Sequence, residues 1–265
     1  MKTDNISEKL NRVFEELAHS AQEDAKRSRK STGFSAIDRL TTGLVDGDLI
    51  VIAGRPAMGK TAFALDIVNH LAKENDKIIA IFSLEMSAEQ IIARLQKSIG
   101  IGYTKGSNLQ IFDDPWMSVK KMSMICESIE NLGAVIIDYI QLISSTEDSV
   151  QENTRKMEMV HISRALKLMA KNMNIPIICL SQLSRTVEHR VDKRPILSDF
   201  YDSGCLIQDA DQILFLYRDL YYNPETPLGD IAECIVAKNR HGDCGTVKLR
   251  WDPEKATFSD VEVVE

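Results

Sequence analysis

The stretch from Val51 to Asp66, VIAGRPAMGKTAFALD, constrains the fold of this chain more than any other part of its sequence. An apolar run leads into a glycine-rich segment with a lysine and a threonine, and a helical pattern follows at once: Gly54, Arg55, Pro56, Ala57, Met58, Gly59, Lys60, Thr61 and Ala62. The spacing G-x-x-x-x-G-K-[ST] between a strand and a helix is typical of a loop whose backbone N–H groups surround a phosphate chain. We therefore predict that these residues bind the phosphates of a nucleotide.

Each residue type in this loop has a physical purpose. Gly54 and Gly59 are expected to adopt backbone conformations that other residues avoid. Lys60 would reach the β- and γ-phosphates, and the Thr61 hydroxyl would bind Mg²⁺. A helix that begins near Lys60 would add the positive end of its dipole. The loop therefore predicts ATP and Mg²⁺ as cofactors.

Strand-like and helical segments alternate along most of the chain, which indicates an α/β fold. Runs that are apolar at consecutive positions suit strands buried on both faces, as in a mostly parallel sheet covered by helices. The predicted strands are 49–53, 78–84, 134–137, 176–180, 212–217 and 234–237, and the predicted helices lie near 60–73, 87–99, 118–131 and 153–173. The alternating stretch GTVKLRWDPEKATFSD predicts a terminal hairpin that turns at Asp252-Pro253.

Composition limits the possible classes of protein. A chain of 265 residues with 44% hydrophobic content can hold one large α/β domain with an appendage. No secretory segment and no apolar run near 18 residues is present, so we expect a cytoplasmic protein without a membrane partner. Of the five cysteines, Cys126, Cys179 and Cys234 lie in apolar runs and are expected to be small core residues. The net charge of −7 argues mildly against a broad basic surface for nucleic acid but permits a local basic channel.

The N-terminal stretch predicts an amphipathic helix followed by a linker. Ile6, Leu10, Val13 and Leu17 are spaced by four, three and four residues, which places them along one stripe of a helix over 5–27. The basic and polar sequence KRSRKSTG follows and is typical of a linker. We predict a linker helix and linker over 1–30 and an ATPase domain over 31–265. The apolar stripe is expected to pack on a neighbouring subunit.

Three polar residues at predicted strand ends could complete a site for hydrolysis. Asp138 ends the run GAVIID, where a carboxylate could hold Mg²⁺ or could simply cap a turn. Glu85 follows IIAIFSL and could orient the attacking water or accept its proton, or it could be a residue at a helix N-terminus. Gln182 follows a strand-like run, where a neutral amide could contact the γ-phosphate. Residue types and spacing alone leave these alternatives open.

A set of longer motifs resembles one family closely. The motifs are GRPAMGKTAFALD, FSLEMS, VIIDYIQLI, the block from Ile162 to Asp219, and VAKNRHG, and together they cover about Thr32 to Phe258. They resemble the C-terminal motor domain of the bacterial and phage replicative DNA helicase family, DnaB. The resemblance implies a RecA-like core, a six-subunit ring with ATP between subunits, and single-stranded DNA in a central channel. The implied activity is ATP hydrolysis coupled to translocation on single-stranded DNA and to unwinding of duplex DNA.

The resemblance also implies roles for particular residues. Glu85 matches the catalytic carboxylate of S-L-E, and Gln182 matches the γ-phosphate sensor of S-Q-L. Lys238 and Arg240 match K-x-R-x-G, whose cations reach the γ-phosphate of the neighbouring subunit. We expect the strand before them to end at the edge of the sheet, with both side chains projecting from its tip and converging on one phosphate.

The DNA-contact loop departs from the family pattern. The family commonly reads S-D-L-R-E-S-G, whereas this chain has Tyr201 in place of the arginine and Asp202 in place of the glutamate. Gly204 and the upstream Arg185 remain as expected DNA-binding residues. Losing one arginine should weaken the electrostatic part of DNA binding. Tyr201 could stack on a base or pack against the next subunit.

Further departures and two other functions stay open at this point. Only IGYTKGS stands where the family usually has an additional helical stretch, and a primase or a helicase loader as partner cannot be inferred. One alternative function is a RecA- or RadA-type recombination ATPase. Another is a non-catalytic assembly module that keeps nucleotide at its subunit interfaces. His241 follows Arg240 and could touch phosphate, but we expect it to be a solvated turn residue, and we expect Trp251 to be a core or interface residue.

Overall fold

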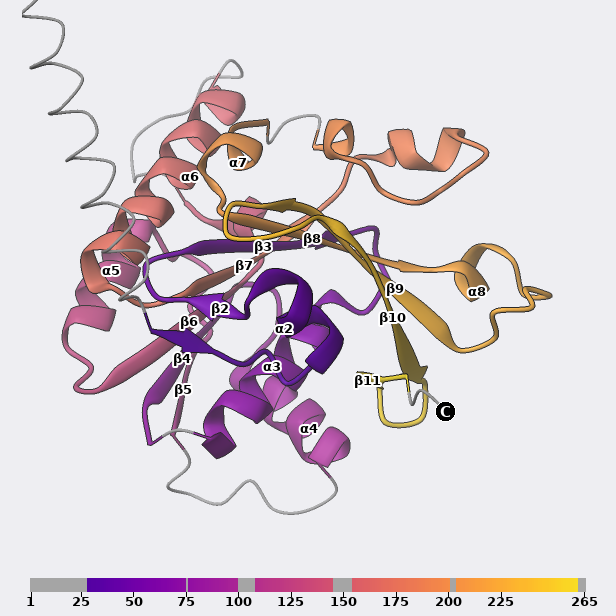
Figure 1. Ribbon diagram of the computed structural model, residues 1–265. Helices are drawn as coiled ribbons and strands as arrows, with labels where there is room; N and C mark the ends of the chain where they lie inside the picture. Colours follow the sequence, from indigo (N-terminus) through magenta and orange to yellow (C-terminus); the bar gives the residue numbers. More distant parts are fainter. Residues whose placement is uncertain (1–27, 75, 100–107, 145–153, 201–203, 262–265) are drawn as a thin grey trace, which may run out of the picture.

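The computed structural model describes residues 28–261 except 75, 100–107, 145–153 and 201–203. Within these residues, nine strands form one sheet in the order β11-β10-β9-β8-β3-β7-β6-β4-β5 (Figure 1). The strands are β3 Leu49–Gly54, β4 Ile78–Ser83, β5 Leu109–Phe112, β6 Leu132–Asp138, β7 Ile177–Gln182, β8 Gln212–Arg218, β9 Ile231–Asn239, β10 Gly245–Asp252 and β11 Thr257–Asp260.

Helices connect these strands. The longer helices are α2 Ser35–Thr41, α3 Lys60–Glu74, α4 Ala88–Ile99, α5 Val119–Glu127 and α6 Thr154–Met173, and the shorter ones are α7 Gly204–Asp209 and α8 Asp219–Tyr222. Three 3₁₀ turns are η1 Ile140–Leu142, η2 Arg185–His189 and η3 Leu197–Asp199. Among the described residues, no helix is both long enough and apolar enough to cross a membrane.

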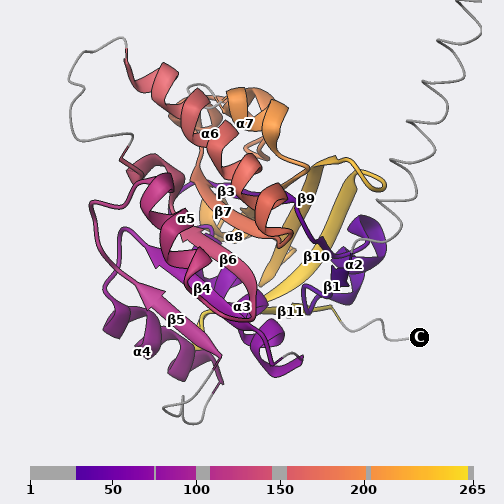
Figure 2. The same cartoon turned by 90° about the vertical axis from the view of Figure 1, so that its left-hand side faces the viewer.

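The helices cover the two faces of the sheet and create two hydrophobic cores (Figure 2). One core joins the sheet to α2, α3 and α4, and the other joins it to α5, α6 and α7. Successive residues of β3 alternate between the cores: Ile50 and Ile52 face the first, and Val51 and Ala53 face the second. Because both faces are covered, every position of β3 is apolar, which is the pattern that predicted a buried strand.

Six neighbouring strands, from β8 to β5, are mutually parallel, as expected for the predicted α/β sheet. The run at 234–237 belongs to β9, which is antiparallel to both β8 and β10. This run is therefore one of the antiparallel strands of a sheet that is mostly parallel, as predicted, and β9 lies between β8 and β10. Burial on both faces gives parallel and antiparallel strands the same apolar sequence, so the run alone could not distinguish them.

The C-terminal hairpin confirms the predicted turn near Asp252-Pro253. Strands β10 and β11 pair antiparallel, with Trp251 opposite Phe258. The two rings contact each other with centroids 4.7 Å apart, and Phe258 also meets Phe63 of α3 edge to face. The hairpin thus packs on the helix that follows the phosphate loop. As predicted, Cys126, Cys179 and Cys234 are buried core residues.

The predicted linker is wrong at its C-terminal end. Arg29–Lys30 form strand β1, which pairs with β2 Leu44–Val45 in a separate two-stranded sheet. Lys30 forms an ion pair with Asp46, and both side chains are nearly buried. Arg29 and Lys30 are therefore part of the folded domain, through their backbone pairing with β2 and the ion pair of Lys30, and a polar composition alone did not reveal this. The predicted helix over 5–27, with its apolar stripe, lies outside the described residues.

Candidate nucleotide site

The ends of four parallel strands bring the predicted catalytic residues together. Gly54 at the end of β3 pairs with Gln182 of β7, and Ser83 at the end of β4 pairs with Asp138 of β6. In a parallel sheet, the carboxyl ends of neighbouring strands share one edge, and ligand sites form in the crevice outside them. The loop after β3 and the N-terminus of α3 lie at this edge.

A pocket of about 450 Å³ opens at this edge. It is lined by Pro56, Ala57, Gly59, Lys60, Thr61, Ala62, Glu85, Arg94, Lys97, Asp138, Tyr139, Gln182, Trp251 and Ala256. The predicted residues Lys60, Thr61, Glu85, Asp138 and Gln182 are thus in one cavity, although they come from four separate stretches of sequence. The volume lies within the range typical of pockets for small ligands.

Lys60 and Thr61 are placed by the first turn of α3. The Lys60 ammonium donates hydrogen bonds to the backbone carbonyls of Gly54 and Arg55, each at 3.1 Å. Burial lowers the pKa of Lys60 to about 8, because desolvation outweighs the attraction of Asp138 and Glu85. The Thr61 hydroxyl donates to Asp138 Oδ2 at 2.7 Å. Burial disfavours the charged form of Lys60, and a bound anion would favour it again, so this lysine is well suited to bind an anion.

The carboxylates of the pocket differ in their surroundings. Asp138 is buried, and burial raises its pKa, with the Thr61 hydrogen bond acting in the opposite direction. Glu85 is exposed and lies on the wall of the same pocket. A buried carboxylate beside a hydroxyl and an exposed carboxylate suit different tasks: the first can hold a cation, and the second can exchange a proton with water.

Gln182 is held by a residue that the sequence motifs did not single out. Gln141 Nε2 donates to the backbone carbonyl of Gln182 at 3.0 Å, and Gln141 Oε1 accepts from the backbone N–H of Gln182 at 3.3 Å. The Gln141 amide also donates to the Ser181 hydroxyl at 3.0 Å. Gln141 follows Asp138 in the same stretch, D-Y-I-Q, and so ties the end of β6 to the end of β7. Its position three residues after Asp138 was a signal that sequence reasoning could have used.

Different structural constraints require glycine at the two glycine positions of the loop. Gly59 has φ +96°, and a Cβ there would come within 2.8 Å of the Phe258 ring. Gly54, against expectation, is an ordinary strand residue of β3 without a positive φ. A Cβ at Gly54 would meet the Leu216 carbonyl of the neighbouring strand at 3.1 Å. Close packing of β8 therefore explains Gly54, whereas Gly59 needs its backbone conformation.

Two other residues of the loop point away from the pocket. The Arg55 side chain reaches Glu188 and the Leu183 carbonyl instead of the cavity. Met58 is 1% exposed and belongs to the core beneath the loop. Only their backbone could contact a phosphate, so the motif assigned the correct loop but not the direction of each side chain.

The pocket wall also includes residues that sequence reasoning missed. Arg94 and Lys97 lie one turn apart on α4, the helix that buries Ile91 and Leu95 in the core. Trp251, expected in a core or an interface, packs half-buried against the first core and also lines the pocket from the C-terminal hairpin. The Arg218 guanidinium lies 4.5 Å from the centre of its ring. A spacing of three residues between cations on an amphipathic helix was the available signal for Arg94 and Lys97.

Lys238 and Arg240 lie far from this pocket in the same chain. Asn239 between them pairs with Gln212, which pairs with Ile50, four residues before Gly54. At about 3.3 Å per strand residue, the cations are roughly 13 Å or more from the phosphate loop along the sheet. As expected, they lie at the end of a strand, since β9 ends at Asn239, but this end of β9 is away from the phosphate loop. Lys238 Nζ donates to the carbonyls of Ile207 and Ala210, both at 2.6 Å.

The two cations converge as predicted, but on a backbone carbonyl. Lys238 Nζ and Arg240 Nη2 both donate to the Gln208 carbonyl at the end of α7, at 3.3 and 2.7 Å. Arg240 also pairs with Asp211 at 3.3 Å. His241, expected to be solvated, has Nε2 2.6 Å from Asp48 Oδ2 and is 16% exposed. These contacts with α7 and Asp48 could not be read from a turn-like sequence.

The predicted DNA-binding residues are only partly described. Arg185 is exposed at the start of η2, and Gly204 is exposed at the start of α7. Tyr201 and Asp202 lie outside the described residues, as does the shortened region near 100–107. Asp199 of the same loop is buried, forms a bidentate pair with Arg190 at 2.7 and 3.0 Å, and accepts from Ile196 N–H at 2.8 Å. An acidic side chain therefore shapes this loop by accepting hydrogen bonds.

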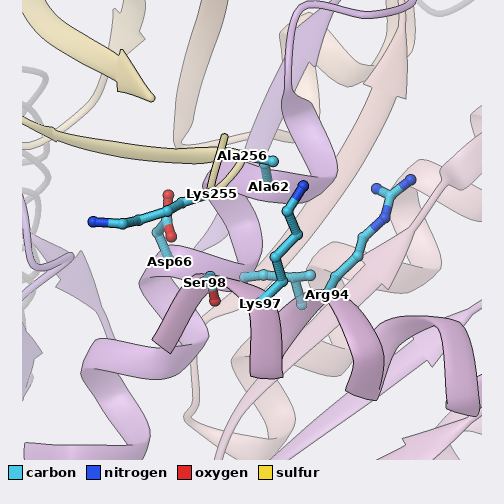
Figure 3. Close-up of a pocket in the computed structure, with 8 residues that line it drawn as sticks. Ala62, Asp66, Arg94, Lys97, Ser98, Lys255 and Ala256 are labelled. Atoms are coloured by element: carbon cyan, nitrogen blue, oxygen red, sulfur yellow. The ribbon is translucent and has the colours of Figure 1, made fainter. Parts of the chain in front are cut away.

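A smaller pocket of about 50 Å³ adjoins the candidate nucleotide site (Figure 3). Arg94 and Lys97 project from α4 in the same direction, and Asp66 and Lys255 lie on the opposite wall (Figure 3). Asp66 Oδ2 accepts from Phe258 N–H at 2.7 Å, which joins α3 to the C-terminal hairpin. Burial raises the pKa of Asp66 to about 7, and this hydrogen bond only partly opposes the shift.

We expect Asp66→Asn to increase the free energy of unfolding by up to about 4 kcal/mol at pH 8 and to change it little at pH 4. A carboxyl whose pKa is higher in the folded state than its unfolded value near 3.9 loses stability as pH rises between the two values. The penalty is fully present above pH 7, and the amide oxygen of asparagine can still accept from Phe258. Urea unfolding at both pH values would measure this, with the exposed Asp76→Asn as control. An equal gain at pH 4 would contradict it.

The fold and the pocket define a class of protein: a P-loop NTPase with a RecA-like α/β core. Within that class, the chain belongs to the family described as DnaB-like helicase C terminal domain, whose model matches residues 30–105 and 98–260.

Individual relatives agree with this assignment. The chain is 38% identical to the replicative DNA helicase DnaB of Geobacillus stearothermophilus, covering 97% of this chain and 62% of that protein. The replicative DNA helicase DnaC of Bacillus subtilis gives the same identity and coverage. The chain thus spans about 62% of the length of these relatives.

Solved structures are similar over nearly the whole chain. One solved ATPase domain is 36% identical, with a TM-score of 0.81 over 97% of this chain and 99% of that one. A DnaB-like replicative helicase, described together with its interactions with primase, is 34% identical, with a TM-score of 0.82 over 97% of this chain and 71% of that one. The RadB recombinase, at 19% identity and a TM-score of 0.62 over 88% of this chain and 99% of that one, shares the fold alone.

Proposed function

We propose that this chain is the motor of a replicative DNA helicase, hydrolysing ATP at the subunit interfaces of a hexameric ring to move on single-stranded DNA and unwind duplex. The observation that carries this proposal is the division of the catalytic residues between two ends of the sheet. Lys60, Thr61, Glu85, Asp138 and Gln182 line one pocket, whereas Lys238 and Arg240 lie roughly 13 Å or more away. A second subunit can unite the two sets.

Within one pocket, the side chains have complementary tasks. The backbone N–H groups of the loop and the Lys60 ammonium bind the phosphates. Glu85 accepts the proton of the attacking water, and Gln182 contacts the γ-phosphate with its amide. Lys238 and Arg240 of the neighbouring subunit neutralise charge that develops during transfer.

The residues also fit Mg²⁺. Thr61 Oγ1 and Asp138 Oδ2 lie 2.7 Å apart, and burial penalises the charge of the Asp138 carboxylate. Hard oxygen donors from a hydroxyl and a carboxylate are what Mg²⁺ prefers beside nucleotide phosphates. Bound Mg²⁺ would neutralise charge on the phosphates, and Thr61 and Asp138 would hold it.

Single-stranded DNA is the proposed substrate of the motor, and Arg185 and Gly204 are proposed contacts together with Tyr201 and Asp202. Arg185 supplies an exposed cation for a phosphate of the strand. The recombination ATPase is less favoured, because the likeness to RadB extends to the fold alone. The assembly module is less favoured, because Glu85 and Gln182 share the pocket with the phosphate loop.

Glu85→Gln tests the proposed function. We expect this variant to bind ATP·Mg²⁺ with nearly normal affinity and to turn it over about 10²–10⁴-fold more slowly, since an amide cannot accept the proton. Turnover would be measured with and without single-stranded DNA, and binding with a fluorescent ATP analogue. Glu89→Gln, an exposed substitution on α4, is the matched control.

The outcomes separate the three functions. Stimulation of wild-type turnover by single-stranded DNA, lost in Glu85→Gln, supports a motor. Nucleotide binding without any turnover in the wild type would support the assembly module. Loss of ATP binding in Glu85→Gln would give Glu85 a structural role. Strand exchange activity without unwinding would favour the recombination ATPase.

A further inference from the structure

Arginine–carboxylate pairs hold residues 184–200, the segment between β7 and α7 that carries Arg185. Arg190 pairs with Asp199 within the segment, at 2.7 Å. Arg194 pairs with Glu233 of β9 in a bidentate contact, with both N···O distances 2.7 Å. A further pair joins Glu188 of η2 to Arg55. The segment is therefore fixed internally, to the sheet, and to one further element.

That further element is the phosphate loop itself. Arg55 Nε donates to Glu188 Oε1 at 2.8 Å, and Arg55 Nη1 donates to the Leu183 carbonyl at 2.8 Å. The Arg55 side chain is 11% exposed and that of Glu188 is 34% exposed. The Tyr222 hydroxyl also donates to Glu188, at 3.2 Å. The Arg55 hydrogen bond is the main reason that the pKa of Glu188 lies below its ordinary value.

The backbone of Arg55 is in contact with Lys60. Lys60 Nζ donates to the Arg55 carbonyl at 3.1 Å, so the cation proposed to bind the phosphates contacts the residue that holds Glu188. The Lys60 ammonium has three N–H donors and uses two of them on the carbonyls of Gly54 and Arg55, so a phosphate that draws the ammonium toward itself weakens the contact with Arg55. The guanidinium of Arg55 donates a hydrogen bond to Glu188, which is three residues after Arg185 in the same 3₁₀ turn.

We propose that the Arg55–Glu188 pair connects the nucleotide pocket to the DNA-contact segment, and that both are positioning residues for DNA-stimulated turnover. This inference rests on the proposed function, because it takes Arg185 as a contact to single-stranded DNA. A connection of this kind works in both directions: nucleotide changes the affinity for DNA by the same factor as DNA changes the affinity for nucleotide.

A contribution to folding stability does not by itself explain why Arg55 and Glu188 form an ion pair here. A partly exposed ion pair contributes little to the free energy of folding, since water screens it and ordering two side chains costs entropy. Its placement is specific, however, because Arg55 belongs to the phosphate-loop motif and does not line the pocket. A structural role would leave the linkage between the two ligands unchanged when the pair is weakened.

Glu188→Gln tests the proposal, with Glu233→Gln as the matched control. Both substitutions remove one carboxylate that holds the same segment, but only Glu188 contacts the phosphate loop. The affinity for a fluorescent oligothymidine would be measured with and without a non-hydrolysable ATP analogue. We expect the ratio of the two affinities to fall about fivefold in Glu188→Gln and to stay unchanged in Glu233→Gln. Turnover without DNA should be unchanged in Glu188→Gln.

A second readout does not depend on DNA. Amide hydrogen exchange over residues 185–189 would be measured with and without the same ATP analogue. We expect the analogue to slow exchange there in the wild type and in Glu233→Gln, but not in Glu188→Gln. Thermal melting would establish that both variants are folded.

The results separate this inference from the proposed function. An unchanged affinity ratio and unchanged protection in Glu188→Gln would overturn the connection, as would equal losses in Glu233→Gln. Failure of the wild type to bind oligothymidine would overturn the proposed function. In that case the exchange experiment would still decide whether nucleotide acts on residues 185–189 through Arg55.

Discussion

Arg240→Ala should lower DNA-stimulated ATP turnover by about 10³–10⁵-fold while leaving nucleotide binding intact. An arginine delivered across a subunit boundary stabilises charge that appears only in the transition state. Arg240 is at the opposite end of the sheet from its own phosphate loop, so its removal leaves that pocket unchanged. The fold should survive, because Asp211 keeps its contacts with Lys167 at 2.6 Å and with Leu49 N–H at 2.8 Å.

Mixing variants distinguishes action across the interface from a structural effect. Arg240→Ala and Glu85→Gln should each turn over ATP only slowly when alone, but mixed rings contain interfaces with an intact Glu85 and an intact Arg240. Turnover should therefore recover partially at intermediate mixing ratios. Arg250→Ala is a suitable control, since Arg250 is an exposed arginine of β10 paired with Asp230 at 3.8 Å. If subunits are shown to exchange and no ratio restores turnover, Arg240 does not act across the interface.

Lys60→Ala should weaken binding of ATP by at least about 100-fold and abolish measurable turnover. The Lys60 ammonium lies on the phosphate loop and carries a positive charge into the pocket. A charge-assisted contact to phosphate in a partly desolvated site contributes about 3 kcal/mol to the free energy of binding. Isothermal titration calorimetry with ATP·Mg²⁺ would measure the loss. Normal ATP hydrolysis by this variant would contradict the assignment of the phosphate loop.

The same substitution should not destabilise the protein. The pKa of Lys60 is lowered to about 8 in the folded state, below the value of about 10.4 for an exposed lysine. At pH 7, below both values, the folded chain carries the full cost of this buried charge, and the cost diminishes as pH rises from 8 to 10. Removing the charge offsets the loss of two hydrogen bonds to Gly54 and Arg55. We expect a melting temperature at pH 7 no lower than that of the wild type.

The elements that sequence reasoning predicted correctly depend on local patterns. β3 is apolar at every position because both of its faces are covered, and α3 begins at Lys60 as the motif requires. Asp138 and Gln182 could be placed at one edge because each ends an apolar run, and parallel strands end side by side. The position of a residue relative to the end of a strand can therefore be predicted from the sequence, because the end of the apolar run marks it.

The direction of each side chain depended on contacts between distant residues. Arg55 turns away from the pocket because Glu188, 133 residues later, lies beside the loop. Trp251 reaches the pocket because the C-terminal hairpin packs on Gly59. The spacing of residues in the sequence does not predict these two contacts, because they depend on how the helices and the hairpin pack on the sheet.

The sequence by itself determined the phosphate loop, the family, and the order of most strands and helices along the chain, although α2 and β5 were not predicted. These follow from spacing within short stretches, where the glycines, the lysine and the apolar runs have a fixed relation. Tertiary structure alone decided that β9 is antiparallel, and this puts Lys238 and Arg240 beside α7 and away from the phosphates. Strand direction is set by how a connection crosses the sheet, and a buried apolar run is the same in either direction.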